Sequence, residues 1–266
     1  MRPGFIERTL ETLADTLRHA RLCEDTAMAP GLLQGVDPRV KVCGLLALIL
    51  AAVSARRFAV TIAVLLLATV LARCSRIALR TLALRTWLGV LLFTGFIALP
   101  SIFLTPGEPA GFGATRQGLL AAARLILRAE TAATLAALLV LTTPWTHVLK
   151  ALRTLRVPAL PVIVLGMTYR YIFLLLRLAQ DFFEARRSRL FRALSRPEQR
   201  HMAGAAAGML LHRSMQLSED VFMAMQSRGF RGEAYTIHDF RLTRRDLLAG
   251  AAFAAAAALA FWGGFA

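Results

Sequence analysis

Long apolar segments, separated by short arginine-rich ones, dominate the pattern of this chain. A helix needs about 20 consecutive apolar residues to cross the hydrocarbon core of a bilayer, and segments close to that length recur from residue 40 onward. The pattern therefore predicts an all-α integral membrane protein with about five transmembrane helices. The predicted spans are 40–55, 58–72, 87–104, 118–142 and 246–265.

The stretch 143–245 departs from this pattern, because its helices are too polar at their ends to lie in lipid. Residues 159–194 begin apolar (ALPVIVLGMTYRYIFLLL) and end charged (RLAQDFFEARRSRLFRAL), which predicts one long helix. A second helix is expected after Ser195. Pro197 suits a first turn, and Glu198 stands three residues after the serine, as in a capping box.

This second helix should run to about Arg228, with Gly229 as a natural C-terminal stop. The two helices together predict a cytoplasmic hairpin whose apolar faces pack on each other or on the spans. Ahead of them, residues 144–158 (PWTHVLKALRTLRVP) predict a short amphipathic helix whose basic face suits the lipid headgroups. The chain thus divides into an amphipathic cytoplasmic segment (1–35), transmembrane helices 1–4 (36–142), the cytoplasmic helical region (143–245) and a last transmembrane helix (246–266).

Loop charges give the expected orientation, because cytoplasmic loops carry an excess of Lys and Arg. Arginines are concentrated in the turn between the second and third spans and in the stretch 143–245, while the Arg56-Arg57 turn is a small exception. With five spans, both basic regions lie on the same side of the membrane. We therefore expect a multi-pass protein of the bacterial inner membrane with its N-terminus in the cytoplasm.

Composition agrees with a membrane protein, since 57% of the 266 residues are hydrophobic and the mean hydropathy is +0.57. The formal charge of +16 is almost entirely arginine, because Lys41 and Lys150 are the only lysines. Such a basic chain suits membrane lipid or an acidic protein partner. Nucleic acid is not an expected partner, because the apolar runs leave little soluble surface and basic and aromatic residues do not alternate.

Motifs of enzyme chemistry are absent from the sequence. A phosphate-binding loop, GxxxxGK[ST], needs a lysine directly after a glycine, and neither lysine of this chain follows one. No GxSxG, HxxH or HExxH motif occurs. His201 and His212 are interpreted as surface histidines, with a weak metal site as the alternative. We expect no enzymatic activity, no cofactor and no bound metal.

Charged residues fall inside the fourth predicted span, where a charge at mid-bilayer costs roughly 2.5–3.5 kcal/mol on insertion scales. They are Arg124, Arg128 and Glu130, and the two arginines share a helix face. One interpretation places both arginines near the outer end of the span, with their side chains reaching to the surface. The other places them against a partner subunit or a polar cavity. In that case the chain could be a self-contained secondary transporter or channel with an intramembrane Arg/Glu site.

One eight-residue phrase occurs twice, as ARRSRLFR (185–192) and AMQSRGFR (224–231). Both copies share alanine, serine, arginine, phenylalanine and arginine at the same positions, and both close a predicted long helix. Arginine presents donors in a planar fork, and beside small residues it can reach into a groove of another protein. Two such ends imply two equivalent binding sites, as on a dimer. The alternative is that both are ordinary basic helix ends.

These segments resemble a known family. The paired helix-end arginines are similar to the two signatures of the transmembrane T component of energy-coupling factor (ECF) transporters. The chain looks most like the CbiQ branch, which serves cobalt and nickel uptake. Residues 35–46 (GVDPRVKVCGLL) and 167–176 (MTYRYIFLLL) resemble that branch, and residues 224–230 (AMQSRGF) match it most closely.

The resemblance implies a coupling subunit rather than an enzyme. Two ABC-type ATPase subunits would each receive one arginine, and the chain would pass their motion to a separate substrate-binding membrane subunit for cobalt or nickel. By position the second arginine is Arg228 and the first is Arg189. Leu190 stands where the family has a small residue, which leaves Arg186 and Arg187 open as the inserted side chain. The residues assigned to ATPase coupling in this way are Ala185, Arg186, Arg187, Ser188, Arg189, Ser227, Arg228 and Gly229.

Overall fold

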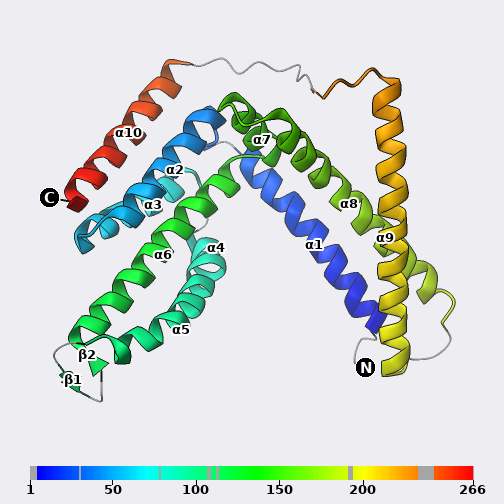
Figure 1. The fold of residues 1–266 in the computed structure, drawn as a ribbon, viewed down its shortest axis with the longest axis horizontal. Coiled ribbons are helices and arrows are strands. Elements are labelled where there is room, and N and C mark those ends of the chain that lie inside the picture. The colour runs from blue at the N-terminus through cyan, green and yellow to red at the C-terminus, as the bar shows by residue number, and fades with distance from the viewer. Residues whose placement is uncertain are drawn as a thin grey trace. The chain divides into compact units, whose positions relative to one another are not determined.

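The computed structural model describes residues 5–29, 31–77, 79–106, 109–111, 114–190, 194–232 and 243–265. These residues are almost entirely helical apart from a small β-hairpin (Figure 1), which confirms the predicted all-α class. The chain folds into two compact units. We call them the bundle unit (24–151 and 239–266) and the hairpin unit (1–23 and 152–238).

Long helices build the bundle unit, and α6 contacts most of them. Helix α6 (Arg116–Thr142) packs against α2 (Pro38–Ser54), α3 (Phe58–Cys74) and α5 (Leu88–Leu104), while α10 (Arg244–Phe265) packs mainly against α2. The shorter elements are α4 (Leu79–Leu82) and a π-helix (Ala83–Trp87) before α5, strands β1 (Pro109–Gly111) and β2 (Ala114–Thr115) before α6, and α7 (Trp145–Thr154) after it. Helix α7 lies where the sequence predicts the amphipathic helix.

Leucine side chains of α2 and α6 form the centre of the bundle core. Leu45, Leu48, Leu135 and Leu138 are fully buried there. Close approach of α2 and α10 depends on Gly44, because a Cβ at this position would lie 2.6 Å from the ring of Phe253 in α10. Small residues are the usual means by which membrane helices approach one another.

The apolar helices agree largely with the predicted spans. Among the described residues, α6, α10 and α8 (Ala159–Arg187) are long and apolar enough to cross a bilayer, and α3 and α5 are apolar but shorter. The five predicted spans do not include α8, because the sequence predicts the stretch 143–245 to be cytoplasmic. Large apolar side chains along its first half are exposed within the chain, Leu160 at 64% and Val164 at 54%. That half of α8 therefore presents large apolar side chains on the surface of the hairpin unit.

The hairpin unit consists of α8, α9 (Arg196–Ser227) and the first part of α1 (Phe5–Met28). Helix α8 slants across α9, and the two run in roughly opposite directions (Figure 1). Helix α9 begins where the sequence predicts it, because Glu198 Oε2 accepts hydrogen bonds from the Ser195 N–H (2.8 Å) and hydroxyl (2.9 Å). It also ends at the predicted stop, with Gly229 at φ +74°.

The predicted extent of the first hairpin helix, to residue 194, is wrong. Helix α8 ends at Arg187, and the amides of Arg189 and Leu190 bond to the carbonyl groups three residues before them. Leu190 and Leu194 both pack against the apolar cluster around Phe183. Phe191, which belongs to the first copy of the repeated phrase, lies outside the described residues.

Replacing Gly44 should separate α2 from α10. Gly44→Leu is expected to destabilise the purified protein by about 1–3 kcal/mol, the usual cost of overpacking a well-packed site. Thermal unfolding in detergent measures the effect. Gly95→Leu is the matched control, because a side chain at Gly95 would meet nothing within 4 Å. Equal stability of the two variants would contradict the role given to Gly44.

Candidate functional site

Both copies of the repeated phrase lie at helix C-termini in the hairpin unit. The first signature (Ala185–Arg189) spans the end of α8, and the second signature (Ser227–Gly229) spans the end of α9. Every residue of both signatures is exposed. Arg186 lines the same small pocket as Pro197 at the start of α9, so the first signature lies near that end of α9. The second signature lies at the other end of this 32-residue helix, about 48 Å along its axis.

The same kind of local hydrogen bond occurs at the end of each of the two helices. The Ser188 hydroxyl donates to the Ala185 carbonyl at 2.9 Å, and the Ser227 hydroxyl donates to the Ala224 carbonyl at 3.0 Å. Each serine thus supplies a donor to one of the last carbonyl groups, which have no amide partner within the helix. The shared alanine and serine of the phrase therefore produce the same compact helix end twice.

The helix ends differ at the next position, where Gly229 corresponds to Leu190. Gly229 adopts φ +74°, and its N–H bonds to the Gln226 carbonyl at 2.9 Å. The Phe230 N–H reaches back to the Met225 carbonyl at 3.0 Å, which completes a Schellman motif. Leu190 does not adopt a positive φ. The difference between Leu190 and Gly229 therefore accompanies a different ending of the two helices.

The arginines of the first signature have different surroundings. Arg187 Nη2 lies 3.6 Å from Glu7 Oε1, in a pair whose side chains are 61% and 45% exposed. The Arg186 guanidinium lies 5.5 Å from the centre of the Phe182 ring, within cation–π range. Arg189 makes no side-chain hydrogen bond or ion pair to another described residue.

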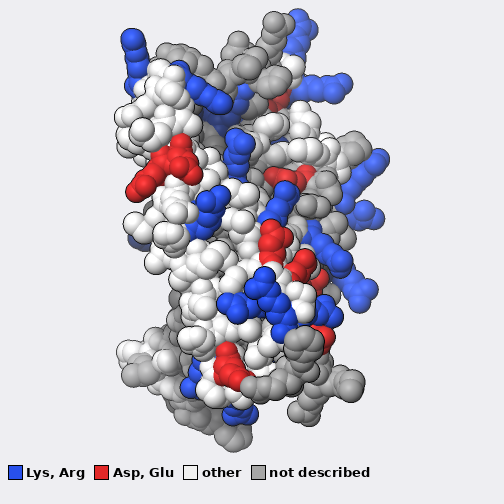
Figure 2. Space-filling model, turned by 90° about the vertical axis from the view of Figure 1, so that its right-hand side faces the viewer, with Lys and Arg blue, Asp and Glu red and all other residues white. Residues whose placement is uncertain are grey.

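Arg228 of the second signature matches Arg189 in this respect, since its exposed side chain has no such partner in the described part of the chain either. Basic side chains are also spread widely over one face of the molecule, with acidic ones between them (Figure 2). General positive charge therefore does not distinguish the signatures. Their distinguishing feature is a helix end where a serine hydroxyl bonds back to an alanine carbonyl, beside an arginine without a partner in the described part of the chain.

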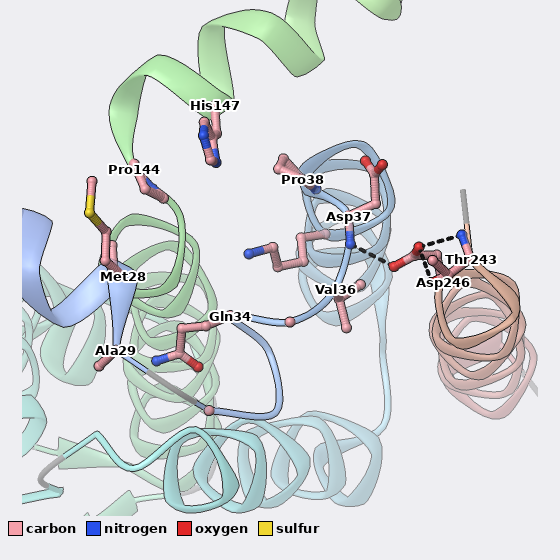
Figure 3. Close-up of a pocket in the computed structure, with 14 residues that line it drawn as sticks. Met28, Ala29, Gln34, Val36, Asp37, Pro38, Pro144, His147, Thr243 and Asp246 are labelled. Carbon is pink, nitrogen blue, oxygen red and sulfur yellow. Dashed lines mark hydrogen bonds between the residues drawn. The ribbon is translucent and has the colours of Figure 1, made fainter. Parts of the chain in front are cut away.

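A second polar arrangement joins α2 and α10 in the bundle unit. Asp37 caps α2, because its Oδ1 accepts the Arg39 N–H at 2.8 Å, and its own N–H donates to Asp246 Oδ1 at 2.7 Å. The other oxygen of Asp246 accepts the Thr243 N–H at 2.8 Å and hydroxyl at 2.6 Å (Figure 3). The acidic residue at the start of α10 thereby holds the start of α2, although sequence reasoning did not single it out.

Lys41 extends this arrangement to α6. Its side chain is 1% exposed, and Nζ donates to the Thr142 carbonyl at 2.9 Å, at the C-terminal end of α6. A cation at a helix C-terminus also interacts favourably with the helix dipole. The segment 35–46 thus connects three helices. Asp37, Lys41 and Asp246 also line a cavity of about 740 Å³, together with His147 of α7 (Figure 3).

The charged residues of the fourth predicted span do not form one site. Arg124 is exposed, and Arg128 Nη2 donates to the Ala55 carbonyl at 2.5 Å, in the turn between α2 and α3. Glu130 is buried, and neither of its carboxylate oxygens has a hydrogen-bond partner among the described residues. The arginine thus interacts with backbone, while the carboxylate stays apart. Within the same residues, His201 and His212 belong to no group that could hold a metal ion.

The fold defines an all-helical, multi-pass membrane protein, and comparisons with known proteins identify its family. A family model described as CbiQ, cobalt transport protein, matches residues 31–237. An uncharacterised protein of Methanocaldococcus jannaschii is 30% identical over 256 residues, which cover 93% of this chain and 88% of that protein. The cobalt transport protein CbiQ of Rhodobacter capsulatus is 33% identical over 158 residues, 56% of this chain and 62% of that protein. The chain therefore belongs to the CbiQ family of cobalt transport proteins.

Removal of the buried lysine should weaken the bundle. Lys41→Met leaves the Thr142 carbonyl without its donor, and an unsatisfied buried polar group costs about 1–3 kcal/mol. The midpoint of thermal unfolding in detergent should fall accordingly. Arg245→Met is the matched control, because Arg245 is exposed next to Asp246. If the two midpoints fall by the same amount, Lys41 does not join α2 to α6 as described.

Proposed function

We propose that this chain is the transmembrane coupling (T) subunit of an ATP-driven ECF-type importer of a transition metal. Cobalt is the first expectation, because the family and the Rhodobacter relative are described as cobalt transport proteins. Nickel is the alternative, and the partner subunit decides between the two. The observation that carries the proposal is the pair of matching helix ends, each with an exposed arginine that has no side-chain partner among the described residues.

Each arginine docks in a groove on one of two ABC-type ATPase subunits. Arg189 and Arg228 are the inserted side chains, because they occupy the same position relative to the hydroxyl of Ser188 or Ser227. Arg186 and Arg187 flank the first contact, where Phe182 and Glu7 already hold them. An exposed guanidinium with all its donors available suits a carboxylate or a row of carbonyl groups in such a groove.

Motion is transmitted because long helices are stiff. Closing of the ATPase pair on ATP moves the two grooves, and the signature ends of α8 and α9 follow them. The hairpin passes this displacement to a separate substrate-binding membrane subunit, which holds the metal. The coupling subunit itself catalyses no reaction and needs no cofactor. It also binds membrane lipid through its apolar helices, and it binds no nucleic acid.

The protein is placed in the bacterial inner membrane with its N-terminus and the signatures on the cytoplasmic side. The arginines of the 143–245 stretch support this orientation by the positive-inside rule. A self-contained transporter with an Arg/Glu site is the rival proposal. Its weakness is that Arg128 bonds to the Ala55 carbonyl and forms no ion pair with Glu130. Metal transport by the purified chain alone, without ATP, would favour that rival.

Removing both inserted arginines should abolish coupling while the protein still enters the membrane. Truncation of a buried charged contact costs roughly 2–5 kcal/mol, so Arg189→Ala with Arg228→Ala should weaken ATPase binding by at least about tenfold. Co-purification of the ATPase subunits and cobalt uptake by cells measure the two effects.

The matched control is Arg186→Ala with Arg187→Ala, which removes the same total charge, here from the end of α8 alone. This variant should retain most of the ATPase binding and uptake. Full co-purification and full uptake by the Arg189/Arg228 double variant would refute the coupling role. A loss confined to the control would instead assign the first contact to Arg186 or Arg187.

A further inference from the structure

The two signatures are held in place by different means, and the difference begins at Leu190. The end of α9 is fixed by its own backbone, through Gly229 and the bond from the Phe230 N–H to the Met225 carbonyl. At the end of α8, the N–H groups of Arg189 and Leu190 bond to the carbonyl groups three residues before them, at 3.1 and 3.3 Å, and the Leu190 N–H makes no bond that spans five residues like that of Phe230. The first signature therefore lacks the Schellman motif that fixes the second, and side-chain packing takes a larger part in positioning it.

An apolar cluster beside the first signature supplies this support. Ile6 of α1, Phe183 of α8 and Ala206 of α9 are each at least 94% buried, at 6%, 6% and 4% exposure. The Phe5 and Phe183 rings meet edge to face, with centroids 6.5 Å apart. Leu190 packs against the same cluster. The Leu190 side chain thus anchors the end of α8 to a cluster that includes Ile6 of α1.

Apolar residues of one side of helix α1 make this contact. Ile6, Leu10 and Leu13 follow helical spacing and belong to or pack against the cluster. Glu7 pairs with Arg187 at the exposed rim, one residue before Ser188. Such an exposed pair contributes little by itself, so the apolar face of α1 carries the attachment.

We propose that the N-terminal part of α1 is the positioning element of the first signature. It holds the end of α8 in the orientation that presents Arg189, and it has no corresponding role at Arg228. This inference rests on the proposed coupling function. It adds that the two ATPase contacts depend on different parts of the chain, so the first contact is lost when α1 is detached and the second is retained.

The test places a carboxylate in the cluster. Ile6→Asp buries an unpaired charge, which is unfavourable by several kcal/mol, and should release α1 from α8. Thr12→Asp is the matched control, because it adds the same group at an exposed position of α1. Ile6→Ala is the milder variant, which retains an apolar cluster and shows the same effect to a smaller degree.

Amide hydrogen exchange of the purified chain gives the first readout. In Ile6→Asp, the amides of residues 188–190 should exchange at least about tenfold faster, because local opening becomes easier. The amides of residues 228–230 should be unchanged, since the Schellman motif is local. Faster exchange at both ends in Ile6→Ala would overturn the inference, as would unchanged exchange at 188–190 in Ile6→Asp.

Cross-linking to the ATPase subunits gives the second readout. Single cysteines replace the equivalent residues Ala185 and Ala224 in a variant without the native cysteines. We expect Ile6→Asp to lower the yield at position 185 and to leave position 224 unchanged. Equal losses at both positions would contradict the positioning role. If neither position cross-links in the parent chain, the coupling proposal itself fails, while the exchange measurement still decides the role of α1.

Discussion

Every helix leaves its last carbonyl groups without amide partners inside the helix, and the way α8 and α9 meet this requirement shapes both signatures. A serine hydroxyl turns back to an alanine carbonyl in each of them. This keeps the helix end compact and leaves the adjacent arginine without a partner among the described residues. The repeated phrase thus forms the C-terminal end of a helix. The coupling role that we propose uses the arginine side chain that this helix end exposes.

Hydrogen bonds at helix ends also join the helices of the bundle unit. Asp37 and Asp246 satisfy amide groups at the starts of α2 and α10, and a single hydrogen bond of 2.7 Å joins the two starts. Lys41 supplies a donor at the C-terminal end of α6. The membrane interior offers no water to satisfy such groups. Polar residues near the ends of the apolar helices therefore help to hold those helices against one another.

The two signatures show how one function can rest on two kinds of support. Gly229 gives the second helix end a shape that depends only on neighbouring residues. Leu190 lacks the positive φ of Gly229, and its side chain instead packs against the cluster of Ile6, Phe183 and Ala206. The Schellman motif at the end of α9 needs only a few neighbouring residues. The end of α8 also depends on the start of α1, more than 170 residues earlier in the chain.

The sequence alone determined the helical class, most of the apolar helices, the start of α9 at Ser195 and its stop at Gly229, because these follow from periodicity and from residues close together in the chain. It also located both copies of the repeated phrase. Tertiary structure decided that α8 stops at Arg187 and that Asp246 holds Asp37, 209 residues away. It also separated Arg128 from Glu130. These outcomes depend on which distant side chains meet when the helices pack, and no local pattern contains that information.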